Sequence, residues 1–192
     1  MCDKETGQIS VPYFSGSGFL LITDLTVISR LNKKRWGIKI KMRPQCTNCV
    51  ILWTGQNRSV LKGDFLLVGI DQDGYPYVSY DLGGGTVTLT DRRNKLTKNT
   101  LQIIRIHRTD EVCVLKTGAT ETFEMIENTR GYTELNSNSG LYIGGHPEGV
   151  GYTNYKPFVG CIISLSINDL DIPMMMRAAY GEDIQQCHSA GT

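Results

Sequence analysis

Long apolar runs are missing from this sequence. No run approaches the roughly 20 residues that a membrane-spanning helix needs, so we expect no membrane insertion. The first residues, Met1 to Glu5, also contain no apolar segment of the kind that a signal peptide carries. If the protein is secreted, we therefore expect the chain to be a mature fragment and part of a larger multidomain protein.

An excess of charge of one sign is missing too. The 20 Lys and Arg residues nearly balance the 19 Asp and Glu residues, and the net charge is +1. No overall field therefore attracts nucleic acid or membranes, and no nucleic-acid-binding motif is present. We expect no nucleic-acid partner, and any electrostatic partner must bind a local patch.

The sequence contains no recognisable catalytic constellation. None of the histidines, His107, His146 and His188, neighbours a Ser or Cys nucleophile in a recognisable elbow. The triplet Gly83-Gly84-Gly85 is not followed by Gly-Lys-Ser/Thr or by a helical pattern, so it is not a phosphate loop. We expect no enzyme. The alternative of a lectin-like hydrolase stays open, because paired carboxylates cannot be found by sequence alone.

Period-two alternation is the main pattern that is present. Segments 38–43, 104–107 and 163–168 alternate apolar with polar residues, as strands with one buried face do. The continuous apolar runs 50–53 and 65–68 are typical of strands in the core of a sandwich. Short strands separated by glycine-rich turns predict one all-β sandwich.

A single segment, Pro173 to Tyr180, indicates a helical turn. Pro173 suits a first helical position, and Gly181 suits a stop.

Several motifs occur in a fixed order along the chain. They are Val11-Pro12-Tyr13-Phe14, Leu52-Trp53-Thr54-Gly55, Tyr75 to Gly85, Leu141-Tyr142-Ile143-Gly144-Gly145, and Gly160-Cys161-Ile162 with the later Cys187. Together they resemble a laminin G-like domain, most of all those of laminin α chains, agrin and perlecan. The resemblance covers residues 8–187, with 1–7 and 188–192 as flanking termini.

The resemblance implies a fold, a location and a bridge. The fold is a jelly-roll β-sandwich of two antiparallel sheets, as in concanavalin A-like proteins. The location is extracellular, with a role in adhesion or matrix assembly. The resemblance also implies a disulfide between Cys161 and Cys187, which would close a loop of roughly 25 residues and contribute about 3 kcal/mol on the chain-entropy model.

The six cysteines allow 15 pairings, and their number alone does not decide between thiols and bridges. Cys46-Thr47-Asn48-Cys49 is a lone CxxC, whereas zinc ribbons need two such pairs. In a secreted domain we expect a short bridge there, or pairing of one of the two with Cys2. Cys113 lies in an alternating segment and is expected to be a buried free thiol.

The resemblance also raises a calcium site at one rim of the sandwich. Carried over by spacing, its side-chain ligands fall on Asn136 and on Thr86, with Gly85 as the alternative to Thr86, and its carbonyls on Ile103 and Glu134. An amide and a hydroxyl carry no charge, so we expect no cofactor or one weakly bound calcium, which would need a charged companion for Asn136. The alternative is that Asn136 is simply a turn residue.

Residues 30–43 contain seven cations and no anion. If the apolar residues of this strand face the core, Lys39, Lys41 and Arg43 line the opposite face, and Arg92 and Arg93 belong to a second basic loop. Sulfated glycans such as heparan sulfate are dense anions that such a stripe would attract, although a merely solvated strand face is the alternative.

The sequence therefore predicts an extracellular, non-catalytic binding module for adhesion or matrix assembly. Its partner would be a heparan sulfate-like or matriglycan-type glycan or a cell-surface receptor, bound through the basic strand and rim loops 86–99, 134–139 and 146–155. The alternative is a purely protein-binding adhesion module of synaptic or polarity type, without glycan or calcium binding. Asn57-Arg58-Ser59 is an N-glycosylation sequon, so Asn57 is a candidate glycan acceptor.

Overall fold

The computed structural model describes residues 9–56, 63–110, 112–118, 125–127, 132–146 and 155–188, and structural statements below concern these residues. Fourteen strands and two helices lie in this part of the chain. They are β1 (Pro12–Ile22), α1 (Leu25–Leu31), β2 (Arg35–Pro44), β3 (Cys49–Gly55), β4 (Phe65–Ile70), β5 (Pro76–Asp81), β6 (Val87–Thr90), β7 (Gln102–Thr109), β8 (Val112–Thr117), β9 (Met125–Glu127), β10 (Leu141–Ile143), β11 (Lys156–Pro157), β12 (Val159–Ile167), β13 (Leu170–Ile172), α2 (Met174–Arg177) and β14 (Tyr180–Gln186).

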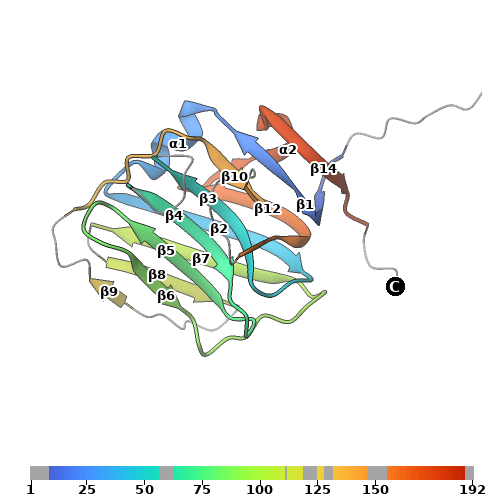
Figure 1. The fold of residues 1–192 in the computed structure, drawn as a ribbon, viewed down its shortest axis with the longest axis horizontal. Coiled ribbons are helices and arrows are strands. Elements are labelled where there is room, and N and C mark those ends of the chain that lie inside the picture. The colour runs from blue at the N-terminus through green and yellow to red at the C-terminus, as the bar shows by residue number, and fades with distance from the viewer. Residues whose placement is uncertain are drawn as a thin grey trace, which may run out of the picture.

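The strands form a sandwich whose two sheets share β1. One sheet has the order β6-β5-β4-β3-β10-β1, and the other has the order β1-β12-β2-β7-β8-β9. The second half of β1 pairs with β10, whereas its first half pairs with β12. Gly16 lies between the halves with a φ of 95°, a conformation that glycine adopts without strain and that allows the strand to change sheets. Figure 1 shows β14 beside β1 at one side of the molecule, where the two strands are paired.

One hydrophobic core fills the space between the sheets. Ile38 and Ile40 of β2 belong to this core together with Leu66 and Val68 of β4, and all four are at most 1% exposed. Burying a side chain of this size contributes about 1.5–3 kcal/mol. The predicted all-β jelly-roll sandwich is confirmed.

The continuous apolar runs of β3 and β4 are explained by burial on both faces. Ile51 and Leu66 point into the core, while Trp53 and Leu67 belong to a second cluster on the outer face of the same sheet. That outer cluster consists of Phe19, Val50, Trp53, Phe65, Leu67, Tyr77 and Tyr142.

The helices differ from the sequence prediction. Helix α1 was not predicted. Its first turn is capped by Asp24, whose Oδ1 atom accepts a hydrogen bond from Thr26 N at 2.8 Å. An Asp at this position is a standard N-cap signal. The expected helical turn over residues 173–180 is wrong at its end, because α2 ends at Arg177 and the chain continues as β14. Arg177 forms an ion pair with Asp24, which ties α2 to the start of α1.

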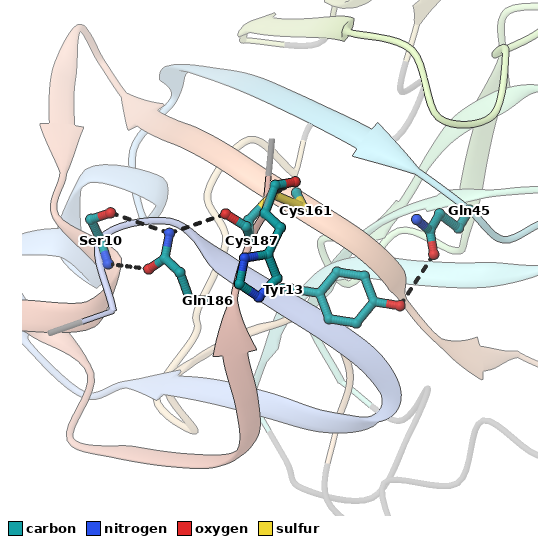
Figure 2. The surroundings of a disulfide bond; sticks show 7 residues. Ser10, Tyr13, Gln45, Cys161, Gln186 and Cys187 are labelled. Atoms are coloured by element: carbon teal, nitrogen blue, oxygen red, sulfur yellow. Dashed lines mark hydrogen bonds between the residues drawn. A yellow bond between two sulfur atoms is a disulfide. The ribbon is translucent and has the colours of Figure 1, made fainter. Parts of the chain in front are cut away.

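The bridge between Cys161 and Cys187 is present and joins β12 to the residue that follows β14 (Figure 2). Cys187 N donates to the carbonyl of Val11 at 2.8 Å, and Ser10 N donates to the Gln186 side chain at 2.8 Å. The C-terminal strand is thus fastened to β12 by sulfur and to the start of β1 by hydrogen bonds.

The other cysteine predictions are also resolved. Cys46 and Cys49 form the short bridge, so the alternative of pairing with Cys2 is wrong; Cys2 itself lies outside the described residues. Cys113 is a buried free thiol, as expected.

Removing the longer bridge tests what it contributes. We expect the double variant Cys161→Ala/Cys187→Ala to lose about 3 kcal/mol of unfolding free energy, because the bridge restricts the unfolded chain over a long loop. Urea unfolding measures the loss. The matched control, Cys46→Ala/Cys49→Ala, opens a loop with a sequence separation of only 3 and should lose less. Equal losses in the two variants would contradict the loop-closure explanation.

Candidate functional site

The outer face of β2 carries the predicted basic stripe. Trp36, Ile38, Ile40 and Met42 are buried against the core, so the residues between them face outwards. Lys39, Lys41 and Arg43 occupy these outward positions and are partly exposed. The predicted orientation of the stripe is confirmed.

Strand pairing extends the stripe into a row across the sheet. Lys39 lies opposite Arg105 of β7, and Arg105 lies opposite Lys116 of β8. On the other side of β2, Lys39 lies opposite Ser166 of β12. We call Lys39, Arg105 and Lys116 the basic row. The sequence alone did not predict that Arg105 and Lys116 lie in one row with Lys39. Alternation shows which face of a sheet a residue occupies, but it does not show which strand lies beside it.

The facing pair of Lys39 and Arg105 is an unfavourable arrangement for the protein alone. Like charges directly opposite each other on paired strands destabilise a sheet by a few tenths of a kcal/mol to about 1 kcal/mol. Within the described part of the chain, no carboxylate forms an ion pair with Lys39, Lys41, Arg43 or Arg105. A bound anion would relieve this repulsion. A hollow of about 520 Å³ also lies on this face, between Arg35 and Lys39 of β2 and the facing residues of β7.

The second predicted basic loop is different. Arg92 forms ion pairs with Asp71 at 2.9 Å and Asp73 at 3.5 Å, and its guanidinium lies 5.3 Å from the centre of the Tyr75 ring. Its charge is therefore offset by local carboxylates. Arg93 is exposed and stays a candidate on charge alone.

The predicted calcium ligand Asn136 has a charged companion that sequence analysis did not find. Both the backbone N and the side-chain Nδ2 of Asn136 donate to Asp64 Oδ2, at 2.9 and 2.8 Å. Asp64 directly precedes β4 and is only 6% exposed. The only sequence signal for this contact was a carboxylate directly before a strand, at the sandwich rim. It could not connect Asp64 with Asn136, because the two residues are 72 positions apart in the sequence.

Two of the other proposed ligands, Glu134 and Thr86, lie in segments near Asp64 and Asn136. Glu134 is in the same segment as Asn136, and Thr86 lies in the turn after β5, where its hydroxyl donates to Asp81 Oδ2 at 3.4 Å. Asp81 Oδ1 also accepts from Gly83 N at 2.8 Å, so this carboxylate shapes the turn. Gly83 lies beside Asp64: a Cβ built on it would be 3.8 Å from Asp64 Oδ1.

Ile103 is not brought to this rim. Its carbonyl accepts from Gly118 N at 3.2 Å, near the start of β7. The neighbour of the Asn136 segment is instead Arg108, at the other end of β7, whose Nη1 donates to Thr133 O at 2.6 Å. Ile103 and Arg108 are five positions apart in extended strand, a distance of about 17 Å. Within the described residues, no cluster of three or more His, Cys, Asp or Glu side chains is suited to a metal ion.

The expected rim loops also lie at two ends of the sandwich. The segment 134–139 lies near the end of β5 through Asp64 and Gly83. Asp91, by contrast, donates from its backbone N to the carbonyl of Pro76 at the start of β5, and the Tyr155 ring is 5.8 Å from that of Tyr77. Part of the range 86–99 is strand β6 rather than loop. Residues 147–154 of the third loop lie outside the described residues, and the described parts of the three segments do not form a single rim.

Comparison with known families decides where the chain belongs. The model of the Laminin G domain matches residues 42–170. The chain is a member of the laminin G domain family. A basement membrane proteoglycan of Caenorhabditis elegans is 24% identical over 182 residues, which are 91% of this chain and 5% of the proteoglycan, so the chain spans a small part of that relative.

Solved structures share the fold. Domains LG4-5 of the mouse laminin alpha1 chain superpose with a TM-score of 0.78 at 16% identity, covering 97% of this chain and 49% of the other. The CBM40 domain of the Ruminococcus gnavus IT-sialidase, solved with alpha2,3 sialyllactose, superposes with a TM-score of 0.67 at 13% identity, covering 89% and 97%.

Membership gives this laminin G domain a general role. Such domains are in general non-catalytic binding modules, and the matched proteoglycan and the two disulfides indicate an extracellular adhesion or matrix module. No helix in the part of the chain that the structure describes has the length and hydropathy for crossing a membrane. The Asn57 sequon lies outside the described residues.

Behind the basic face, the laminin G domain buries three ionisable groups. Arg108 is 1% exposed, lies opposite Trp36 and Cys113 on its two neighbouring strands, and places its guanidinium 5.7 Å from the centre of the Tyr80 ring. Burial lowers the pKa of Arg108. It raises the pKa of the Cys113 thiol to about 12 and that of the Tyr80 phenol to about 12, and the neighbouring guanidinium opposes both increases.

These pKa values predict a loss of stability in alkali. The folded protein holds the protons of Cys113 and Tyr80 above their ordinary pKa values of 9.0 and 10.0. The associated stabilisation is complete below about pH 9 and is lost as pH rises towards about 12, because the unfolded chain gives up these protons first. Urea unfolding from pH 8 to 11 should show the decline. In Cys113→Ala the part that begins near pH 9 should be absent, and an identical pH dependence in both proteins would contradict the assignment.

Proposed function

We propose that this laminin G domain binds sulfated, acidic glycans through the outer face of β2, β7 and β8. The observation that carries the proposal is the basic row of Lys39, Arg105 and Lys116, which Lys41 and Arg43 extend along β2. A polymer with regularly repeated anions matches a surface of regularly repeated cations.

Charge segregation supports the proposal. The whole chain carries a net charge of only +1, so the cations of this face are balanced by acids elsewhere. Some of those acids are already occupied by other groups: Asp71 pairs with Arg92, and Asp24 pairs with Arg177. The basic face is therefore a local feature and not a consequence of a basic protein.

Heparin affinity tests this function. At neutral pH, Lys39→Glu and Arg105→Glu should each weaken heparin binding about tenfold, equal to about 1.4 kcal/mol, because each replaces attraction by repulsion. Elution from a heparin column and calorimetry with heparin measure the effect. Lys156→Glu is the matched control: it changes the net charge equally but lies in β11, beside β3 in the other sheet.

The alternative function predicts a different result. A purely protein-binding module would elute from heparin at or below physiological salt, and the two charge reversals would change nothing. That result would contradict glycan binding on this face.

We also propose one weakly held calcium ion at the rim that contains Asp64. The donor set fits the ion: calcium takes carboxylate, amide and carbonyl oxygens, Asp64 and Asn136 are in direct contact, and Glu134 precedes Asn136 by two residues. Asn136 presents its Nδ2 to Asp64, so binding would require the amide to turn its Oδ1 towards the ion. With one carboxylate in the set, we expect affinity of the order of 10⁻⁴ to 10⁻³ M, as in other extracellular modules. The ion would supply a positive charge at the rim.

A melting experiment tests the calcium proposal. Calcium at about ten times its dissociation constant should stabilise the wild type by about 1.4 kcal/mol and raise its melting temperature. Asp64→Asn should remove this increase, whereas Asp73→Asn, an exposed residue in the turn before β5, should keep it. An unchanged melting temperature and no heat in calorimetry at millimolar calcium would rule the site out.

A further inference from the structure

We infer that the hollow above Gly37 is a subsite for a single sulfate ester and that the glycan crosses the strands from β2 towards β8. This inference rests on the proposed glycan-binding function, and it adds to that function a specific pocket and a direction.

Gly37 creates the hollow. It occupies an outward position of β2, between the outward positions of Arg35 and Lys39, and therefore leaves a gap in the row of side chains. The ring of His107, directly opposite on β7, lies over Gly37 and forms one wall of the hollow: a Cβ built on Gly37 would be only 2.9 Å from His107 Nδ1. On the other side, Gly37 N donates to Asn168 Oδ1 at 2.7 Å, so the floor of the hollow is held in place.

Donors surround the hollow on β2 and β7. Arg35 and Lys39 stand two residues before and after Gly37, each about 7 Å away along the strand. Arg105 is opposite Lys39, and Thr109 is opposite Arg35. A sulfate ester presents three terminal oxygens, which the planar fork of an arginine and the ammonium of a lysine can bind together.

Arg35 can turn to a ligand at little cost. Its ion pair with Asp110 is long, at 3.5 Å, and the side chains of both residues are well exposed, 75% and 48%. Exposed pairs of this kind contribute about 0–1 kcal/mol. Arg35 is therefore available to an anion in the hollow, and loss of the Asp110 contact is a small penalty.

The direction of the glycan follows from charge. Neighbouring strands are about 4.8 Å apart, so the basic row from Lys39 to Lys116 spans about 10 Å perpendicular to the strands. On the opposite side of the hollow, the exposed Asp169 follows β12 and lines the margin. A polyanion is repelled there and attracted towards β8.

Fluorescence titration of the protein with a heparin hexasaccharide tests the inference. The comparison probe is a hyaluronan hexasaccharide, which carries carboxylates but no sulfate. Gly37→Val should weaken binding of the heparin probe at least fivefold without changing any charge, because the new side chain would push the His107 ring into the hollow and reduce its volume. Arg105→Gln should weaken it similarly, and Asp169→Asn should tighten it two- to threefold. Wild type should bind the hyaluronan probe at least tenfold more weakly.

Several outcomes separate the inference from the proposed function. If the wild type binds neither probe, the proposed function fails, and the inference fails with it. If heparin binds but Gly37→Val and Asp169→Asn behave as the wild type, while Lys41→Gln and Arg43→Gln lose affinity, the face binds glycans along β2 and the subsite is wrong. A melting curve shows whether Gly37→Val folds. If it does not fold, the inference is tested by Arg105→Gln, which should weaken heparin binding, and by Asp169→Asn, which should tighten it. No change in either variant would overturn the inference.

Discussion

The register of β2 between β12 and β7 decides which side chains form the basic face. Side chains alternate between the two faces of a strand, so a shift of one residue would turn every cation into the core and every apolar residue into solvent. Burial prevents the shift: Trp36, Ile38, Ile40 and Met42 are between 0 and 4% exposed. At about 1.5–3 kcal/mol for each buried side chain, this far exceeds the repulsion between like charges on the outer face. The hydrophobic core thus holds the cations close together against their mutual repulsion.

The same strands connect the basic face to the rim. Arg108 follows the outward-facing His107 on β7 and points inwards, where its guanidinium donates to the Thr133 carbonyl, three residues before Asn136. Asp64 then holds Asn136 from the other sheet. A buried guanidinium is unfavourable without partners, so the contact with Thr133 and the face of the Tyr80 ring favour one position for this segment. Strand β7 therefore supports both the basic face, through its outward residues, and the segment that contains Asn136, through Arg108.

Sequence reasoning succeeded where a signal is local. Alternation along residues 38–43 was enough to orient Lys39, Lys41 and Arg43, and ordered motifs were enough for the fold and the Cys161–Cys187 bridge. It failed where a contact joins distant residues. Arg105 became part of the site through the pairing of β7 with β2, and Asp64 through a hydrogen bond across 72 positions. Ile103 was assigned from spacing alone, and spacing does not show which end of a strand approaches a loop.

A backbone NMR titration with a heparin hexasaccharide shows directly where on the folded protein the glycan lies. We expect amide shifts to change most at residues 35–39 and 105–109, with smaller changes around Lys116. We expect little change at the loop that contains Arg93. Shifts confined to the segments 91–100 or 132–140, with β2 and β7 unaffected, would contradict glycan binding on the outer face of β2 and β7.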